Sequence, residues 1–585
     1  MQYKLKSLIK NNYLKTILAE RGITDPVEYL NPVSADIETW KNLDNITRGV
    51  DMLLKHLGND EKIALIVDCD CDGYTSSAII YNFIKKIFPT TDITFKVHEG
   101  KQHGLEDMID YLQDNYFNLV IVPDAGSNDF EFQKILNEQG TDCLILDHHS
   151  VDTIDEEYYN NNEHTIIINN QLSHNYLNKD LSGAGVTWQF CCGVEEALGL
   201  EPNDYITPSL LDLAAVGIIG DCMSMIGLEN RAFSYFGLQH IYNPFLKAIV
   251  EKQAFSLKRE ENISPTGVSF SIAPLINSIV RVGTYEEKIK MFEAFIDGEK
   301  IVPSTKRGAK GELEQLCVQM TRECLNAKNR QDTAIEKAMN SLDMTIQREG
   351  LAEDNAVIVA NADDLTFPST LNGLVAMKLT DKYKKPVLVV RSNSEGFLQG
   401  SARNEGSGEF KDFRHFLLDS GYFEYAQGHD NAFGVSINEK SVDNFLSYAN
   451  EKLKDVNFND NFYEVEFNLR ANDDELKDII FEVYQDDRLW GQKNSAPLLC
   501  ITNLELNKSD IQICGSRKDT LRFKYNGVTY IKFFATNDIE KIMNTAEDNI
   551  TLTIIGEGAI NEWCGTVSPQ VMIKDYEIGG TIFDF

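Results

Sequence analysis

The segment IALIVDCDCDG, residues 63–73, joins a short apolar run to three alternating aspartates. The apolar run is rich in β-branched residues and predicts a buried strand, and the spacing of SSAIIYNFIKKIF (76–88) predicts a helix after it. Apolar runs recur at 119–123, 143–146 and 165–169. Strands that alternate with helices indicate βαβ units, so we expect an α/β domain built on a parallel sheet that is buried on both faces.

Acidic and histidine side chains follow the predicted strands. Alternate residues of an extended segment face the same way, so the first two aspartates can converge. In open α/β sheets ligands bind outside the carboxyl ends of the strands, and we expect the polar side chains of separate strands to meet in one crevice. The set comprises Asp68, Asp70 and Asp72 after the first strand, Asp124 after the second, Asp147, His148 and His149 after the third, and Asp221 after an apolar helix predicted at 210–220.

Such a group of carboxylates favours a bound divalent cation, because unpaired like charges raise one another's pKa and destabilise a fold. Oxygen ligands with one or two imidazoles suit Mn²⁺ or Mg²⁺ better than a tetrahedral thiolate zinc site. Two ions that share a bridging carboxylate can activate water and stabilise a transferring phosphoryl group, and Asp124 is our candidate bridge. A lone Asp after a strand is more often a helix cap, so the joint occurrence carries the prediction of a metal-dependent phosphoesterase.

Length, charge and cysteine usage limit the class of protein. The 585-residue chain is too long for one core and predicts about two to four domains. Its net charge of −35 argues against a surface coated with basic residues, although a local basic groove is compatible with that total. We expect neither a signal peptide nor a membrane span, because no long apolar run is present. The 11 cysteines form no CxxC pair, which favours a reducing cytoplasm over a disulfide scaffold.

Changes in pattern along the chain indicate four regions. Residues 1–60 are expected to be helical and to belong with the first α/β block, so that a catalytic domain spans 1–284. Charged residues with helical spacing predict a connecting helical region at 285–350, and further apolar runs predict a second, smaller α/β domain at 351–457. Short alternating strands and the hairpin signal Asn526-Gly527 predict a small β-barrel at 458–585.

Nine segments, which occur along the chain in the order that the family has them, resemble the DHH phosphoesterase superfamily, and specifically the RecJ single-strand exonucleases. Four carry the catalytic motifs: DCDCDG (68–73), PDAGSND (123–129), LDHHS (146–150) and GIIGDC (217–222). The others are LSGAGVTW (181–188), APLINSIVRVG (273–283), QGSARN (399–404), QGHDNAFG (427–434) and WGQKNSAP (490–497). The resemblance covers nearly the whole chain. It implies a parallel-sheet DHH domain, a long connecting helix, a DHH-associated substrate-binding domain and a barrel like the oligonucleotide-binding (OB) fold.

The resemblance also implies a role for each matching residue. The implied metal ligands are Asp68, Asp70, Asp124, His148 and Asp221, with Asp72 as a neighbouring or additional ligand. Among the implied catalytic residues, Asp147 would orient the histidine and His149 would contact the scissile phosphate. The implied substrate-binding residues are Asn277, Arg281, Arg403 and His429, the last three at phosphates or at the 5′ end of the strand.

Four positions depart from the family pattern. Leu275 stands where the family has an arginine, Gln427 replaces a glycine before His429, and Phe433 replaces a small residue after it. Cys71 replaces the usual alanine or valine of the first motif. These changes concern substrate binding more than metal binding, so the sequence supports hydrolysis more strongly than it identifies the strand that is hydrolysed.

Three functions are compatible with these patterns. The first is an exonuclease that uses Mn²⁺ or Mg²⁺ and releases mononucleotides from single-stranded DNA, 5′ to 3′ as the resemblance implies. Basic and aromatic residues interleave at 522–525 and 530–534, as a strand-binding face requires, although alternate aromatics also fill barrel cores. The second is a phosphodiesterase for short oligonucleotides or cyclic dinucleotides. The third is a binding scaffold without catalysis, which the intact acidic motifs disfavour.

The expected partner is therefore single-stranded DNA, with RNA and short oligonucleotides as alternative substrates. A role in DNA repair or recombination would add contacts with single-strand-binding or replication and repair proteins. No membrane partner is expected.

Overall fold

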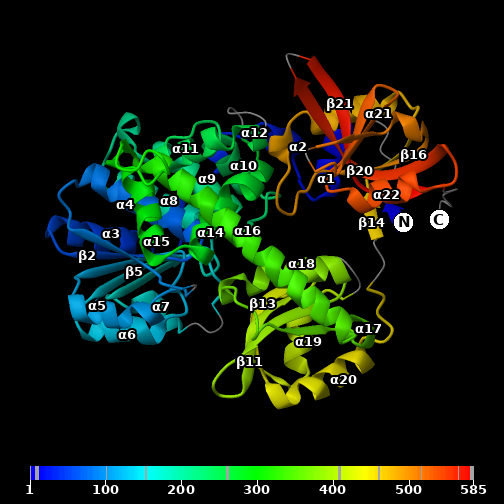
Figure 1. Ribbon diagram of the computed structural model, residues 1–585. Helices are drawn as coiled ribbons and strands as arrows, with labels where there is room; N and C mark the ends of the chain where they lie inside the picture. The colour runs from blue at the N-terminus through cyan, green and yellow to red at the C-terminus, as the bar shows by residue number, and fades with distance from the viewer. Residues whose placement is uncertain are drawn as a thin grey trace.

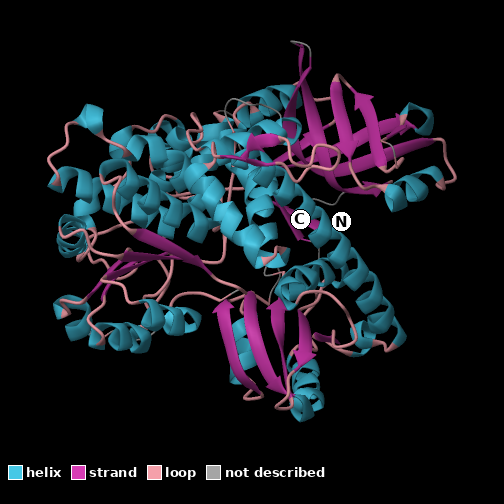
Figure 2. Cartoon of the chain, turned by 60° about the vertical axis from the view of Figure 1, so that its left-hand side comes forward, coloured by secondary structure: helices cyan, strands magenta, loops and turns pink. Residues whose placement is uncertain are grey.

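The computed structural model describes residues 2–6, 12–100, 102–151, 155–257, 263–405, 410–458, 462–515, 517–563 and 566–579. Three large sheets, each with its own hydrophobic core, are separated by helices (Figure 1, Figure 2). The first sheet belongs to the N-terminal α/β domain, the second to a smaller α/β domain, and the third to the C-terminal β domain. The predicted fold class is thus confirmed.

The first sheet is parallel and has the strand order β3-β2-β4-β5-β6. The strands are β2 (Ile63–Val67), β3 (Ile93–Val97), β4 (Leu119–Pro123), β5 (Asp142–Asp147) and β6 (Thr165–Asn169). Helices cover both faces. One face packs on α3 (Ile46–Gly58), α4 (Cys71–Ile87) and α8 (Gly183–Ala197), and the other on α5 (Ile109–Asn115), α6 (Phe130–Glu138) and α7 (Glu156–Asn161). Burial on both faces explains why β2, β4, β5 and β6 are largely apolar runs, whereas the edge strand β3 is only partly buried.

A helical layer extends the core that α4 and α8 form. It contains α9 (Leu211–Gly220), α10 (Leu228–Gly237), α11 (Pro244–Lys252), α14 (Ala273–Val282) and α15 (Tyr285–Asp297). The short α12 (Ala254–Leu257) follows α11, and α13 (Pro265–Gly267) with the π-helical turn η6 (Val268–Ile272) leads into α14. The apolar helix predicted at 210–220 is confirmed as α9.

The long connecting helix is α16 (Leu316–Arg348), which runs from the first domain to the second (Figure 1). Leu316 and Met320 at its start are buried in the first core, and Leu342 and Ile346 near its end are buried in the second. The region predicted as one helical connection at 285–350 is therefore divided into α15, the hairpin of β7 (Ile301–Pro303) and β8 (Leu313–Gln315), and α16. No described helix is both long enough and apolar enough to cross a bilayer.

The second domain contains a five-stranded sheet with the order β12-β13-β11-β10-β9. Its strands are β9 (Ile358–Asn361), β10 (Val387–Ser392), β11 (Phe397–Arg403), β12 (Phe423–His429) and β13 (Ala432–Asn438). Short α17 (Leu351–Asp354) precedes the sheet, and α18 (Asn372–Tyr383) packs on one face with α16. The other face packs on α19 (Phe413–Asp419) and α20 (Val442–Lys452).

The C-terminal domain is a seven-stranded sheet with the order β15-β16-β20-β21-β19-β18-β17. Its strands are β15 (Phe467–Arg470), β16 (Leu498–Asn507), β17 (Gln512–Cys514), β18 (Thr520–Tyr525), β19 (Val528–Lys532), β20 (Asn549–Trp563) and β21 (Thr566–Ile578), with α21 (Glu475–Tyr484) and α22 (Thr536–Met543) packed on them. Asn526 and Gly527 have φ values of 46° and 80° and join β18 to β19. Positive φ at both residues suits a two-residue hairpin, which confirms that prediction.

The N-terminal segment differs from its prediction. Residues 2–5 form a strand, β1 (Gln2–Leu5), that pairs in parallel with β14 (Phe462–Val465), and not a helix. Helices α1 (Tyr13–Glu20) and α2 (Pro26–Leu30) follow it, and their buried Leu18 and Tyr29 belong to the core of the C-terminal domain. The sequence assigns this segment to the catalytic domain because a contact between chain ends leaves no local signal.

Asp142 begins β5 at the amino end of the sheet, and its replacement is expected to lower stability without lowering activity. Its carboxylate lies 2.9 Å from His56 Nε2 and 2.7 Å from His164 Nδ1, and accepts from Lys55 Nζ at 3.2 Å. Burial raises the pKa of Asp142, but the hydrogen bonds with the three partners outweigh burial and lower the pKa to about 2. Asp142→Asn should cost about 2 kcal/mol at neutral pH, the size of a charged hydrogen bond.

The lowered pKa of Asp142 determines how its contribution to stability depends on pH. A folded-state pKa below the usual value means that the stabilisation is present above pH ~4 and is lost as pH falls toward about 2. Thermal midpoints measured across this range should therefore converge for the variant and the unaltered protein at the acidic end. A difference in thermal midpoint that stays constant at all pH values would contradict a stabilising role for the ionised Asp142 carboxylate.

Candidate active site

The carboxyl ends of the parallel strands carry an acidic cluster at the topological switch point of the sheet. β3 and β4 lie on opposite sides of β2, so the crevice forms between the ends of β2 and β4. Asp68 and Asp124 follow these two strands, and Asp70 is the N-cap of α4. Ligand oxygens of the three aspartates lie within 4.8 Å of one another. The fold therefore brings together acids that are far apart in the chain.

His148 joins the cluster from the end of β5. Its Nε2 atom lies 3.2 Å from Asp124 Oδ1, 3.4 Å from Asp221 Oδ2 and 3.9 Å from Asp72 Oδ2. Asp221 is the residue at which α9 ends. One group of donors contains Asp68 and Asp70, the other contains Asp72 and Asp221, and the contact between Asp124 and His148 joins them. Two adjacent donor groups with an aspartate between them suit a pair of cations.

Two glycines allow α8 and α9 to approach the cluster. A Cβ atom at Gly183 would lie 2.5 Å from Asp124 Oδ1, and one at Gly217 would lie 2.4 Å from Asp72 Oδ1. Both distances are too short, so these positions require glycine. Asp124 itself has a φ of 67°, a left-handed conformation that Asp and Asn adopt more readily than most residues. Such backbone geometry is concentrated at functional sites.

The electrostatics of the cluster fit a divalent cation. Asp124 Oδ1 and His148 Nε2 are buried and make no hydrogen bond with a described residue. Burial raises the pKa of Asp70, Asp124 and Asp221, and the neighbouring carboxylates raise it further. Burial also lowers the pKa of His148, which favours the neutral imidazole that binds metals. Donors that are buried, unpartnered and mutually repulsive are those that a Mn²⁺ or Mg²⁺ ion would satisfy.

Asp72 contacts the start of α8. It is fully buried and accepts hydrogen bonds from Ser182 Oγ at 2.9 Å, from the Gly183 amide at 2.7 Å and from the Ala184 amide at 3.1 Å. A carboxylate at a helix N-terminus is stabilised by the amides there. Because its two oxygens are largely engaged by α8, Asp72 is better placed to hold this helix against the cluster than to be a principal ligand.

Asp147 orients His149. Its Oδ1 lies 2.8 Å from His149 Nδ1 and accepts from the amides of His148 and His149, while Oδ2 accepts from the Ser127 amide at 2.9 Å. Burial would raise the pKa of Asp147, but the charge of His149 and these donors hold it well below its usual range. Burial alone would lower the pKa of His149, and Asp147 raises it to about 10. A half-exposed imidazolium beside the acidic cluster can contact a phosphate.

Two arginines lie beside the cluster, one from each α/β domain. Arg281 is on α14, and Arg403 ends β11. The negative charge of Asp70 raises the pKa of Arg281, and the positive charge of Arg281 lowers the pKa of Arg403, so these groups lie near one another. Burial lowers the pKa of both guanidinium groups, and neither forms an ion pair with a described residue. Two close, half-buried cations without carboxylate partners suit a phosphate dianion.

Asn277 and His429 lie around the same crevice. Asn277 is one turn before Arg281 on α14, and its buried Oδ1 has no hydrogen-bond partner among the described residues. His429 ends β12, is exposed, and lies near enough to His148 to affect its pKa. The structure thus brings Arg281, Arg403 and His429 near the acidic cluster from segments about 150 residues apart, and Asn277 lies one helical turn from Arg281.

The departures from the family pattern have structural explanations. Leu275 is buried in the core of the first domain, so its side chain does not face the crevice. Phe433 is buried against Phe413 in the second domain, with ring centroids 5.5 Å apart, and Cys71 is buried next to α9. Gln427 is exposed on β12 beside the segment that carries His429. Only Gln427 is therefore placed to alter substrate contacts directly.

The basic and aromatic segment of the C-terminal domain divides between core and surface. Phe523 and Tyr530 are buried and stack with centroids 5.0 Å apart, as the alternative reading of the pattern predicts. Phe533 and Phe534 are 54% and 85% exposed, and Arg522 is exposed on β18. Only part of the segment is thus available to a nucleic-acid strand.

Two histidines near the cluster are not identified by the sequence analysis. His103 Nδ1 lies 2.6 Å from Asp68 Oδ2, and the buried His98 lies 3.7 Å from Asp68 through Nε2 and 2.9 Å from Asp107 through Nδ1. Both follow β3, a strand whose sequence, ITFKV, is less apolar than its neighbours. The rule applied to the other strands, to inspect polar residues after the carboxyl end, finds them only once β3 is recognised as a strand.

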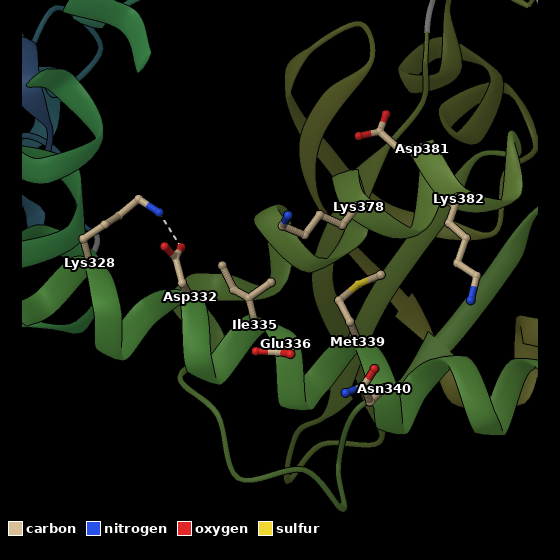
Figure 3. A pocket seen from close by; sticks show the side chains of 9 residues that line it. All are labelled: Lys328, Asp332, Ile335, Glu336, Met339, Asn340, Lys378, Asp381 and Lys382. Carbon is tan, nitrogen blue, oxygen red and sulfur yellow. Dashed lines mark hydrogen bonds and ion pairs between the residues drawn. The ribbon is translucent and has the colours of Figure 1, made fainter. Parts of the chain in front are cut away.

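Other polar surfaces are found in the second domain and along the connecting helix α16. Asp412, His415 and Asp430 form an exposed group in the second domain. A groove of about 700 Å³ lies between α16 and α18 (Figure 3), with an apolar floor and a rim of both charges. Its lining comprises Lys328, Asp332, Ile335, Glu336, Met339, Asn340, Lys378, Asp381 and Lys382, and includes none of the predicted site residues.

Comparisons with known proteins agree with this geometry. Residues 62–218 match the DHH family N-terminal domain, and residues 470–575 match the RecJ OB domain. The fold and the acidic site thus define a member of the DHH family. The chain is 36% identical, over 585 residues, to a putative SPbeta prophage-derived single-strand DNA-specific exonuclease, YorK, of Bacillus subtilis (strain 168), covering 99% of this chain and 98% of the relative.

Two further relatives define the group more closely. The single-stranded-DNA-specific exonuclease RecJ of Bacillus subtilis (strain 168) is 24% identical over 98% of this chain and 69% of its own length. The crystal structure of RecJ in complex with Mn²⁺ from Thermus thermophilus has a similar fold, with a TM-score of 0.73 and 19% identity over 98% of this chain and 79% of that one. The chain belongs to the RecJ-type single-strand exonucleases, and is accordingly a hydrolase.

Proposed function

We propose that the protein is an exonuclease that uses two Mn²⁺ or Mg²⁺ ions to hydrolyse single-stranded DNA from the 5′ end and release mononucleotides. The observation that carries this proposal is the position of the two arginines. Arg281 and Arg403 place two positive charges close to each other beside a cluster of metal-type donors. A terminal phosphate held there would put the first phosphodiester bond near the acidic residues.

The proposed metal ligands are Asp68, Asp70, Asp124, His148 and Asp221, with Asp124 shared between two ions. When bound, such ions supply an activated water and neutralise charge on the transferring phosphoryl group. The protein's own contribution is to fix these donors, because Gly183 and Gly217 let two helices close on the cluster. Asp72 is proposed to hold α8 in place.

The remaining residues would bind and orient the strand. His149, kept protonated by Asp147, would contact the scissile phosphate. Arg281 and Arg403 would bind the terminal 5′-phosphate, which would set the direction of digestion. Asn277 and His429 would contact the same end of the substrate. Each of these roles places a positive or polar group where the phosphates of the strand would pass.

The exposed surface of the C-terminal domain favours a substrate strand longer than a dinucleotide. An exposed pair, Phe533 and Phe534, offers rings on which bases can stack, and Arg522 on the neighbouring strand β18 offers a positive charge. A phosphodiesterase confined to dinucleotides would not need this surface. Gln427 on β12, which stands where the family has a glycine, is the feature that favours the alternative, activity on short oligonucleotides or cyclic dinucleotides.

A length series distinguishes these substrates. We expect 5′-phosphorylated single strands of about 2 to 40 nucleotides to be digested to mononucleotides with Mn²⁺ or Mg²⁺, and not in EDTA. The rate per enzyme should rise with length until the strand reaches the C-terminal domain, because a longer strand binds more of the protein. Activity confined to the shortest substrates, or to the 3′ end, would contradict the proposal. Matched RNA strands test the choice of sugar.

The wider setting is also a proposal. The ten cysteines that the structure describes form no disulfide with one another, which is compatible with a reducing cytoplasm. We propose a role in repair or recombination of DNA, where single-strand-binding or replication and repair proteins would meet the enzyme on the same strand.

A further inference from the structure

A turn of the C-terminal domain reaches the loop that follows Asp221. The Met225 amide donates to the carbonyl of Gln492 at 2.9 Å, and the Tyr29 hydroxyl donates to the carbonyl of Met225 at 2.6 Å. Met225 is buried and lies four residues after Asp221. Both backbone polar groups of this residue are therefore held by segments that belong to the C-terminal core and not to the DHH domain.

Tyr29 and the turn form one connected unit. Asn494 is fully buried, and its Nδ2 donates to the Tyr29 hydroxyl at 3.0 Å and to the Leu489 carbonyl at 3.0 Å. Arg21 Nη1 donates to Asn494 Oδ1 at 2.7 Å, and Gly491 and Asn494 exchange backbone hydrogen bonds that close the turn. We call the four residues Tyr29, Gly491, Gln492 and Asn494 the Met225 clamp.

The clamp also contacts the segment that leads to Arg281. Thr266 Oγ1 donates to the carbonyl of Trp490 at 3.1 Å, and Thr266 lies on α13, which continues through η6 into α14. A Cβ atom at Gly491 would lie 2.7 Å from Met225 Cγ and 3.2 Å from Pro265 Cβ. The turn thus fits tightly between the Asp221 loop and the helix of the substrate-binding residues, and no larger residue fits at Gly491.

The loop after Asp221 depends on such support. Cys222 has a φ of 59°, a left-handed conformation that costs a residue other than glycine about 1 kcal/mol or more. The amides of Cys222 and Met223 close the end of α9 on the carbonyls of Ile219 and Ile218, and the Ser224 carbonyl accepts from Asn230. The next anchor is Met225. Strained backbone of this kind keeps one conformation only where its surroundings fix it.

We propose that Tyr29 and Asn494 are positioning residues for the Asp221 carboxylate, so that the N-terminal helix and the C-terminal domain complete the metal site. The inference rests on the proposed function, because it takes Asp221 to be a ligand. Removal of a group that hydrogen-bonds a metal ligand directly typically changes metal affinity by about 10- to 100-fold, and we expect the lower end of this range because Tyr29 acts on Asp221 through Met225.

A pair of Tyr→Phe variants tests this inference in the full-length protein. Tyr29→Phe removes the hydroxyl that joins Met225 to Asn494. The matched control is Tyr484→Phe, because Tyr484 is buried in the same C-terminal core and donates to the Pro497 carbonyl at 2.7 Å without reaching the DHH domain. Two quantities are measured: hydrogen exchange of the peptide that contains Met225 in metal-free protein, and the Mn²⁺ dissociation constant by calorimetry.

We expect Tyr29→Phe to speed exchange at Met225 and to weaken Mn²⁺ binding by about tenfold, while Tyr484→Phe changes neither. Gly491→Ala should have the same two effects, since it displaces Met225 while leaving the Tyr29 hydroxyl in place. Equal Mn²⁺ affinities in Tyr29→Phe and Tyr484→Phe would overturn the inference, whether or not exchange is faster. An unaltered protein that binds no Mn²⁺ would instead overturn the proposed function, and this inference with it.

Discussion

Replacement of Asp124 by asparagine is expected to lower hydrolysis of single-stranded DNA by about a thousandfold or more and to leave the fold intact. Asparagine accepts the left-handed backbone at this position, where φ is 67°, and keeps the size of the side chain. What it removes is the carboxylate between the two donor groups, 3.2 Å from His148. Initial rates on end-labelled strands with saturating Mn²⁺ give the measurement.

The same substitution should raise the thermal stability of the metal-free protein. Burial and the neighbouring carboxylates raise the pKa of Asp124, so its ionised form destabilises the fold as pH rises above the ordinary carboxyl value. Asp212→Asn is the matched control, because Asp212 is also buried but accepts from the amides of Leu213, Tyr242 and Asn243 outside the cluster. Burial raises the pKa of Asp212 as well, to about 6, so the control is compared by activity, which it should keep. Substantial activity in Asp124→Asn would refute the site.

Arg403→Gln is expected to raise KM for 5′-phosphorylated strands by about 30-fold, with a smaller change in kcat. A charged hydrogen bond to phosphate contributes about 2 kcal/mol, and each 1.4 kcal/mol is a factor of ten. The KM for strands with a 5′-hydroxyl should rise much less, since these strands lack the dianion that the two arginines would bind. The Mn²⁺ dissociation constant should not change, because Arg403 lies beside Arg281 and not among the acidic donors.

Arg322→Gln serves as the control for Arg403→Gln. Arg322 is on α16 and pairs with Glu314 at 2.7 Å, so its charge is already compensated and faces no phosphate site. It should change KM little. If Arg403→Gln lowers the affinity for Mn²⁺, or affects both kinds of 5′ end equally, the arginine does not recognise a terminal phosphate.

The parallel sheet and its acidic edge are predictable from the sequence because their signals are local. Strands β2, β4, β5 and β6 of the first sheet are apolar runs, and Asp68, Asp124 and Asp147 with His148 stand at or directly after the ends of three of them. The rule that ligands bind at the carboxyl ends of the strands then places them together without further information. The hairpin at Asn526-Gly527 is predictable for the same reason, because two adjacent residues determine the turn.

Contacts between distant segments are not predictable in this way. Nothing in the tetrapeptide at residues 2–5 indicates that it will pair with a strand near residue 462, and nothing in the sequence around Tyr29 indicates Met225 as its partner. His103 is missed for a different reason, because β3 is only partly buried and its mixed sequence does not identify it as a strand. The division of 285–350 follows from a short hairpin whose strands are too brief to leave a pattern.

The pairing of β1 with β14 has a consequence for how the chain is made. The paired residues are separated by 460 positions, so during synthesis at roughly 5–20 residues per second the first strand leaves the ribosome about 20 to 90 seconds before its partner exists. Its open edge must wait through the folding of two intervening domains. Deletion of residues 2–5, or a tag that blocks their open edge, should therefore damage the domain that contains β14, and the yield of folded protein should depend on keeping that edge free until β14 has been made.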